Sequence, residues 1–304
     1  MVDTVTCRFT ATPWQSLPVG WKRVTSRFDQ GGQLASSKEG RETVRRSHET
    51  TGLQVGGNER GATWFQVSIP RFVNGNNAEL LTSEAELQTA KERITQTIND
   101  VCDFNPRQAD ARATRIDPVA YMPVPLKDMI AAHRASRHPK FHASAAVYTG
   151  ESLRFEGRKR LFRMYCSNLL KNGVSGPCTR VEWQLRSSAL EKDFGRPVYW
   201  LHLGMKDCYQ VYRDLCLGFD VPEIVEVDSI HHLLALAELN NWCHQGIPAV
   251  ELYCRFRAAT ANKIRRKIGA CRPDVFNFRW ANFLPPTFEE FRVLASQYPP
   301  VLSK

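Results

Sequence analysis

The sequence predicts an α+β fold, with a mainly antiparallel sheet covered by helices on one face and a small helical C-terminal domain. Several short stretches alternate apolar and polar residues, which is the period of a half-buried strand. Two longer stretches place apolar residues at helical spacing. Their order along the chain is strand, helix, strand, helix, strand, strand, which favours an α+β domain whose second sheet face stays open.

The first strand is predicted in residues 1–10, where Val5, Cys7 and Phe9 alternate with polar residues. Residues 29–62 are polar and rich in glycine, which favours a long loop or a hairpin arm, and a mobile surface excursion is the expected form. Basic side chains in this stretch could bind a phosphate backbone: Lys38, Arg41, Arg45 and Arg46. Strand character returns in residues 63–69 and stops before Pro70.

A helix is predicted in residues 84–103. Ser83 followed by Glu86 forms a capping-box pattern at its start. Apolar residues then recur at helical spacing: Leu87, Ala90, Ile94, Ile98 and Val101.

The middle of the chain continues with a short strand in residues 113–117. Pro118 lacks a backbone N–H, which places this point at a strand end or a sheet edge. A second helix follows Pro125, with Leu126, Met129, Ile130 and His133 on one side. Residues 147–150 and 153–155 predict two short strands that turn at glycine.

Two strands carry the candidate chemistry. In residues 160–166, Phe162, Met164 and Cys166 form an apolar face, and Arg163 and Tyr165 share the other. In residues 179–186 the polar row is Arg180, Glu182, Gln184 and Arg186. The turn residues of 171–177 predict that these strands form a hairpin, which would bring Tyr165 near Glu182.

The last part of the chain predicts helices. We expect a main domain in residues 1–220 and a helical domain in residues 221–304. Thr260 can cap a short helix whose exposed side is basic: Lys263, Arg265, Arg266 and Lys267. This helix either contacts duplex DNA or is a solvated basic surface packed on the first domain.

The formal net charge of +10, from 41 Lys and Arg against 31 Asp and Glu, favours a polyanionic partner, of which nucleic acid is the commonest. An ordinary basic enzyme is the alternative. No stretch has the apolar length of a membrane-spanning helix or the pattern of a signal peptide, so we expect a soluble, intracellular protein without a membrane partner. The nine scattered cysteines favour free thiols over disulfides.

A tyrosine, arginines and carboxylates on one sheet face suit the cleavage of a phosphodiester. The Tyr165 phenolate could attack phosphorus, and Arg163 and Arg180 would neutralise charge on the phosphate. The carboxylates of Asp117 and Glu182 could hold Mg²⁺ or Mn²⁺. The alternative is an amphipathic sheet whose wet face carries tyrosine and arginine–glutamate pairs with no catalytic role.

The motifs together resemble a known family. They are residues 114–117 (Thr-Arg-Ile-Asp), 161–165 (Leu-Phe-Arg-Met-Tyr) and 179–186 (Thr-Arg-Val-Glu-Trp-Gln-Leu-Arg), with further likeness in residues 190–197, 239–246 and 260–269. The combination resembles the replication initiators of filamentous phages, the gene II protein type, and more distantly the plasmid rolling-circle initiators. Two departures from the family pattern are Pro118 and the uncharged residues 166–168 after the tyrosine.

The resemblance implies a rolling-circle replication initiator: a site-specific, metal-dependent DNA nickase and strand transferase that cuts and rejoins one strand at an origin. Tyr165 would form the covalent 5′-phosphotyrosine intermediate, with Asp117 and Glu182 in the metal-binding role. Residues 1–220 would be the nicking domain and residues 221–304 the DNA-binding domain. Origin DNA, a host helicase and a host polymerase would be partners in the bacterial cytoplasm.

Several basic residues are DNA-binding candidates: Arg115, Arg158, Lys159, Arg160, Arg186, Lys263, Arg265, Arg266 and Lys267. A non-catalytic single-strand or duplex nucleic-acid-binding protein is the main alternative function. An enzyme acting on a small phosphorylated substrate is disfavoured, because no Gly-rich phosphate loop follows a strand and opens a helix. The oligomeric state stays open.

Overall fold

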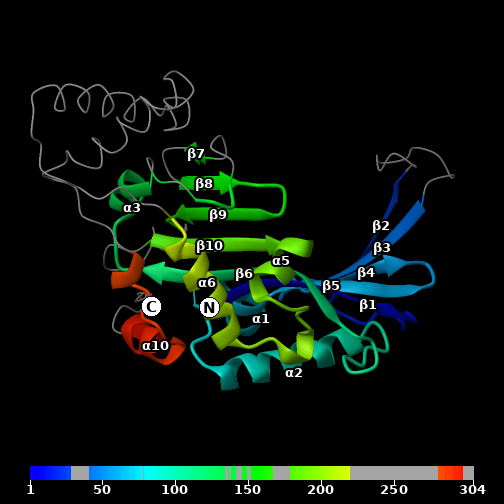
Figure 1. The fold of residues 1–304 in the computed structure, drawn as a ribbon. Coiled ribbons are helices and arrows are strands. Elements are labelled where there is room, and N and C mark those ends of the chain that lie inside the picture. Colours follow the sequence, from blue (N-terminus) through cyan, green and yellow to red (C-terminus); the bar gives the residue numbers. More distant parts are fainter. Residues whose placement is uncertain are drawn as a thin grey trace, which may run out of the picture. The chain divides into compact units, whose positions relative to one another are not determined.

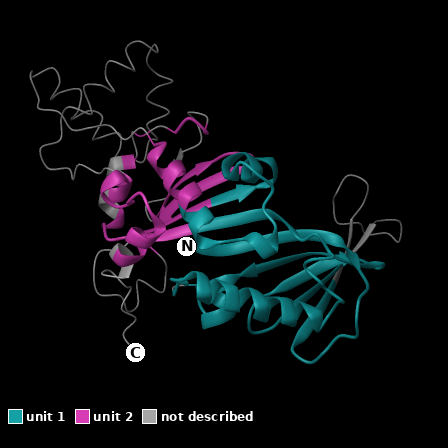
Figure 2. Cartoon of the chain, turned by 60° about the horizontal axis from the view of Figure 1, so that its bottom comes forward, with its two compact units in different colours: residues 1–118, 184–209 teal, residues 119–183, 210–304 magenta. Residues whose placement is uncertain are grey.

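The computed structural model describes residues 1–28, 41–77, 79–133, 136, 138–141, 146–148, 152–166, 179–219 and 280–296 (Figure 1). The chain divides into two compact units (Figure 2). Unit 1 contains residues 1–118 and 184–209, and unit 2 contains residues 119–183 and 210–304. The predicted helical domain of residues 221–304 lies outside the described residues, except for residues 280–296.

Unit 1 is built on antiparallel strands in the hydrogen-bonded order β2-β3-β4-β5-β1-β6. Their bounds are β1 (Val2–Thr12), β2 (Trp21–Phe28), β3 (Arg41–His48), β4 (Gln54–Asn58), β5 (Gly61–Ser68) and β6 (Arg112–Met122), of which residues 112–118 belong to this unit. The predicted first strand and the strand at residues 63–69 are confirmed. The α+β class with a mainly antiparallel sheet is confirmed as well.

The described part of residues 29–62 forms β3, β4 and the start of β5, and β3 pairs antiparallel with β2 and β4. The hairpin alternative is therefore confirmed for this part, and the expected surface excursion is wrong. Two glycines of β4 serve close approach. A Cβ on Gly56 would lie 2.2 Å from the Trp64 ring, and a Cβ on Gly57 would lie 2.0 Å from the Gly61 carbonyl oxygen. Glycine is therefore required at both of these strand positions, although a glycine-rich stretch is typical of a loop.

Helices cover one face of the unit 1 strands. They are α1 (Ile69–Asn74), α2 (Glu84–Asn99), α5 (Ser187–Phe194), the short η2 (Trp200–His202) and the start of α6 (Met205–Leu217). Figure 1 shows α1 and α2 beside β1 and β5. The predicted capping box of α2 is present, with Ser83 Oγ accepting from the Glu86 amide at 3.2 Å. Val5 and Cys7 are fully buried on the helix-covered face of β1.

The strand that contains Asp117 is longer than predicted. β6 continues through Pro118 to Met122, so the expectation of a strand end at Pro118 is wrong. Pro118 pairs with Val2, and the register between β1 and β6 is irregular between Val2 and Val5. A proline fits such an irregularity because the missing N–H disrupts no regular ladder bond.

Unit 2 has its strands in the order β10-β9-β8-β7. Their bounds are β7 (Ala146–Tyr148), β8 (Ser152–Glu156), β9 (Arg160–Tyr165) and β10 (Thr179–Arg186), with the last three residues of β10 in unit 1. Its helical elements are α3 (Leu126–His133), residues 210–217 of α6, η3 (Trp280–Asn282) and α10 (Phe288–Ser296). The predicted second helix and the two short strands are confirmed. Phe162 and Trp183 are fully buried in an aromatic core, with ring centroids 4.9 Å apart.

His133 lies in this aromatic core, with its ring 5.3 Å from Phe219 and Nδ1 2.9 Å from the Met129 carbonyl oxygen. Burial lowers the pKa of His133 from 6.5 to about 4. Between these pH values the unfolded chain binds a proton that the folded protein excludes. The free energy of unfolding should therefore fall by about 3 kcal/mol as the pH falls through this window.

Denaturant unfolding of the wild type and of His133→Gln between pH 7 and pH 4 checks this contribution. Glutamine cannot take up the proton, so the variant should lose less stability than the wild type over the window. Parallel stability curves for the two proteins would contradict a buried neutral histidine.

Candidate active site

Tyr165 and Glu182 meet in unit 2, as the predicted hairpin requires. Tyr165 is the last residue of β9 and Glu182 is central in β10. The phenol Oη donates a hydrogen bond to Glu182 Oε2 at 3.1 Å. The two strands are neighbours in the hydrogen-bonded order. The sequence prediction that these side chains lie together is confirmed.

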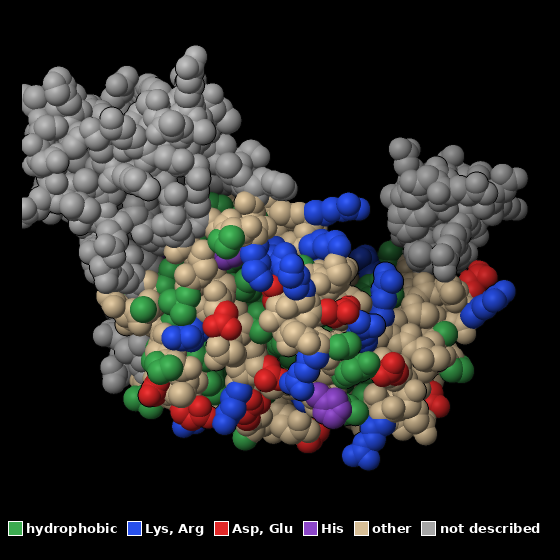
Figure 3. Space-filling model, viewed as in Figure 1, with side chains coloured by type: hydrophobic (Ala, Val, Ile, Leu, Met, Phe, Trp, Pro, Cys, Tyr) green, Lys and Arg blue, Asp and Glu red, His purple; other side chains and the backbone are tan. Residues whose placement is uncertain are grey.

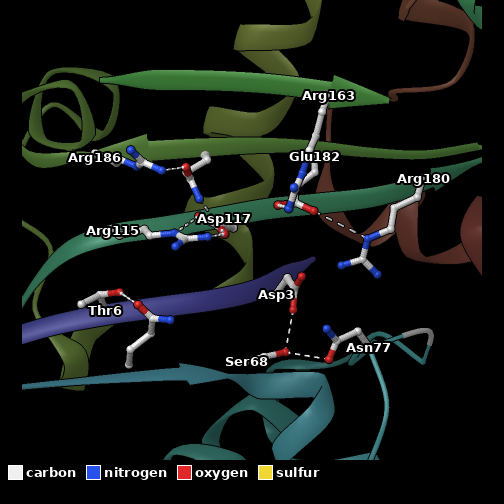
Figure 4. Close-up of polar contacts among 12 residues, drawn as sticks. Asp3, Thr6, Ser68, Asn77, Arg115, Asp117, Arg163, Arg180, Glu182 and Arg186 are labelled. Carbon is white, nitrogen blue, oxygen red and sulfur yellow. Dashed lines mark hydrogen bonds and ion pairs between the residues drawn. The ribbon is translucent and has the colours of Figure 1, made fainter. Parts of the chain in front are cut away.

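Two arginines complete this cluster (Figure 4). Arg163 Nη2 donates to Glu182 Oε1 at 2.5 Å, and Arg180 Nε lies 3.7 Å from Glu182 Oε2. The Arg163 guanidinium also lies 5.3 Å from the centre of the Tyr165 ring. The carboxylate is thus shared between one phenol and two cations. Such an arrangement places positive charge close to a potential nucleophile.

Most of this cluster is buried. Glu182 is fully buried, Arg180 is 2% exposed, Tyr165 is half-buried, and the Arg163 side chain is 38% exposed. The polar row of β10 was expected on an open face, and this is wrong for Arg180, Glu182 and Gln184. Buried charges must be paired and hydrogen-bonded, so these contacts are not the weak pairs of a wet surface.

The phenol of Tyr165 is held in its protonated form. Burial is the largest cause that raises its pKa above the ordinary value of 10, and the Glu182 charge raises it further. The guanidinium groups of Arg180 and Arg163 act in the opposite direction without cancelling these effects. Cleavage by Tyr165 therefore requires a base that accepts the phenol proton, and Glu182 Oε2 already accepts that hydrogen bond.

Asp117 is the centre of a separate cluster, in unit 1. Its carboxylate is 1% exposed and accepts from Arg115 Nε at 2.8 Å and from Arg115 Nη2. Gln184 Nε2 lies 3.4 Å from Asp117 Oδ2, and Arg186 Nη2 donates to Gln184 Oε1 (Figure 4). Both oxygens of Asp117 are therefore engaged by Arg115.

The two metal candidates are each neutralised by arginine. Asp117 is bound by Arg115, and Glu182 by Arg163. Among the described residues, no group of three or more His, Cys, Asp or Glu side chains could hold a metal ion. A divalent cation would have to compete with these guanidinium groups, so the arrangement as it stands does not fit one.

The other predicted DNA-binding residues either lie apart from these two clusters or lie outside the described residues. Arg158 and Lys159 are exposed in the turn that joins β8 and β9, and Arg160 begins β9. Lys263, Arg265, Arg266 and Lys267 lie outside the described residues. On the face drawn in Figure 3, Lys and Arg side chains are interspersed with Asp and Glu side chains. Within the described ranges, no helix has the length and apolar character needed to cross a membrane.

Two further residues join these polar contacts: Tyr121, which the sequence offers as a possible substitute for Tyr165 near the sheet, and Asp3, which was not predicted. Tyr121 Oη accepts from Arg180 Nη1 at 3.1 Å in unit 2. Asp3 is 5% exposed in unit 1 and accepts from Ser68 Oγ at 2.7 Å (Figure 4). Alternation places Asp3 on the same side of β1 as Val5 and Cys7. The only sequence signal for Asp3 is a charge within an apolar pattern.

No protein-family model and no curated protein matches the sequence. Among solved structures, the chain is similar to a rolling circle replication initiator protein from Geobacillus stearothermophilus, with a TM-score of 0.40, 11% identity, and coverage of 76% of this chain and 89% of that chain. It is also similar to the TBP of Methanococcus jannaschii, with a TM-score of 0.30, 8% identity, and coverage of 64% and 91%. Neither likeness is close enough to carry a function across to this chain.

Proposed function

We propose that this protein initiates rolling-circle replication by cutting one strand of origin DNA and rejoining it later through a covalent tyrosine intermediate. The observation that carries the proposal is the cluster of Tyr165, Glu182, Arg163 and Arg180. The motif resemblance to phage and plasmid initiators implies roles for Tyr165 and Glu182 of this cluster. A nucleophile, a proton acceptor and two cations are the groups that this reaction needs.

The cutting step follows from these contacts. Tyr165 Oη attacks the scissile phosphorus and gives its proton to Glu182 Oε2, which already accepts its hydrogen bond at 3.1 Å. The bond between phosphorus and the 3′ oxygen breaks, and the leaving oxygen takes a proton from water. Arg163 is the cation with solvent access, so its guanidinium can turn to a phosphate oxygen as the negative charge on phosphorus grows. Reversal of these steps by a free 3′ hydroxyl reseals the strand.

Dependence on Mg²⁺ or Mn²⁺, with Asp117 and Glu182 as the metal-binding carboxylates, stays a prediction from the sequence, because arginines bind both carboxylates. If this prediction holds, cleavage should rise with the ion concentration and vanish in a chelator. Nicking of supercoiled DNA against ion concentration measures this, and full cleavage in the chelator would contradict it.

The test of the function is a covalent adduct. Supercoiled DNA that carries the gene neighbourhood of this protein is incubated with the full chain and Mg²⁺ or Mn²⁺. A denaturant-resistant protein–DNA adduct whose linked peptide contains Tyr165 is the expected result. Specific binding to this DNA without any nick or adduct would overturn the proposal.

A non-catalytic nucleic-acid-binding protein is the second candidate. The raised pKa of Tyr165 and the full burial of Glu182 favour it, because a saturated buried network can be purely structural. The adduct experiment separates the two candidates, since only the first forms a covalent bond to DNA.

A further inference from the structure

The face of the unit 1 strands opposite the described helices carries a row of side chains in direct register. Arg45 of β3 pairs with Gly56 of β4, Gly56 with Trp64 of β5, and Trp64 with Arg8 of β1. Directly paired residues of antiparallel strands point to the same face. Val5, Cys7 and Phe9 face the helices, so Arg8 and its row lie on the opposite face.

The indole of Trp64 lies over Gly56. A Cβ on Gly56 would be 2.2 Å from Cζ2, 2.3 Å from Cε2 and 2.7 Å from Nε1 of Trp64. Because three ring atoms lie this close to the Cβ position of Gly56, the Trp64 ring lies flat over the glycine backbone. Trp64 is half-buried. Its Nε1 donates no hydrogen bond to a described residue. One face of a large aromatic ring thus rests on backbone.

Two exposed arginines flank this ring. Arg8 is directly opposite Trp64 on the next strand, about 5 Å away, and Arg45 is two strands away on the other side, at about 10 Å. Both side chains are exposed, and neither forms an ion pair with a described residue. An aromatic ring between unpaired cations is the combination that binds single-stranded nucleic acid.

The strand that carries Arg45 is firmly held. The neighbouring Arg46 points to the opposite face, where Nη1 donates to the carbonyl oxygens of Gln15 at 2.8 Å and Val101 at 3.1 Å. Its guanidinium also lies 4.5 Å from the centre of the Trp14 ring. Arg46 therefore fixes β3 to the rest of unit 1. The backbone of Arg45 is thus held in place on the open face before any ligand binds.

We propose that Arg45, Trp64 and Arg8 form a binding site for single-stranded DNA, in which a base stacks on Trp64 and the two arginines hold flanking phosphates. The site needs no base-specific contact, so it tolerates any sequence. This inference rests on the proposed function only in that DNA is chosen as the polyanion. Tyr165 takes no part in this binding site.

The test is the affinity of the full chain for a fluorescently labelled twelve-residue oligothymidylate, measured by anisotropy at several salt concentrations. Trp64→Leu keeps apolar bulk over Gly56 but removes the ring, and it should lower affinity about tenfold. Trp64→Phe keeps a ring and should retain most of the affinity. Arg8→Ala and Arg45→Ala should each lower affinity and reduce the salt slope by about 0.7.

Arg60→Ala is the control, because Arg60 is an exposed arginine in the turn between β4 and β5, outside the row. Thermal unfolding of every variant separates lost folding from lost binding. Folded Trp64→Leu with wild-type affinity would overturn the proposal, and so would an equal loss in Arg60→Ala. Failure of cleavage in the wild type would remove the proposed nickase function and leave these binding results unaffected.

Discussion

Tyr165→Phe is expected to abolish strand cleavage and the covalent adduct, while the variant folds and binds DNA as the wild type does. The change removes one hydroxyl, which is the proposed attacking atom, and keeps the ring beside the Arg163 guanidinium. It also removes the hydrogen bond to Glu182, which should lower the free energy of unfolding by about 1 kcal/mol. Nicking of supercoiled DNA, adduct formation and denaturant unfolding measure the three quantities.

Tyr199→Phe is the matched control. Tyr199 is a half-buried tyrosine of unit 1 that forms an isolated bridge with Arg112 through the backbone, and its hydroxyl has no part in the proposed chemistry. It should nick at the wild-type rate. Residual cleavage by Tyr165→Phe close to that of Tyr199→Phe would refute the assignment of the nucleophile, whatever happens to stability.

Glu182→Gln should have the second largest effect, on cleavage and stability together. Glutamine keeps the shape of the side chain but cannot accept the phenol proton, so cleavage should fall roughly a hundredfold or more. The substitution also removes the negative charge that pairs with both guanidinium groups, and Arg180 is only 2% exposed. Loss of one partner of a buried ion pair should lower the free energy of unfolding by about 3 kcal/mol.

The exposed ion pair of Arg154 and Glu156 provides the comparison for Glu182→Gln, since its side chains are 45% and 49% exposed. Glu156→Gln should change stability by less than about 1 kcal/mol and leave cleavage intact. A purely structural Glu182 would instead give a destabilised variant that still nicks at low temperature. Cleavage rates measured where both variants are folded decide between these outcomes.

Local sequence signals determined much of this protein. The capping box of Ser83 and Glu86 fixes the start of α2, because both partners lie within one helical turn. Strict alternation predicts which side chains of β9 share a face. The turn-forming residues between β9 and β10 predict a hairpin, and with it the contact of Tyr165 and Glu182. Each of these depends on residues close together in the chain, where backbone geometry alone decides the neighbours.

The tertiary structure decided what alternation could not. Alternation tells which residues share a face, but not whether that face meets solvent, so the burial of Arg180, Glu182 and Gln184 had to come from the fold. In the sequence, the glycines of β4 have the composition of a loop. Only the fold shows that the Trp64 ring lies over Gly56, where a side chain would not fit. Such contacts join distant parts of the chain, and the free energy of packing them outweighs local strand propensity.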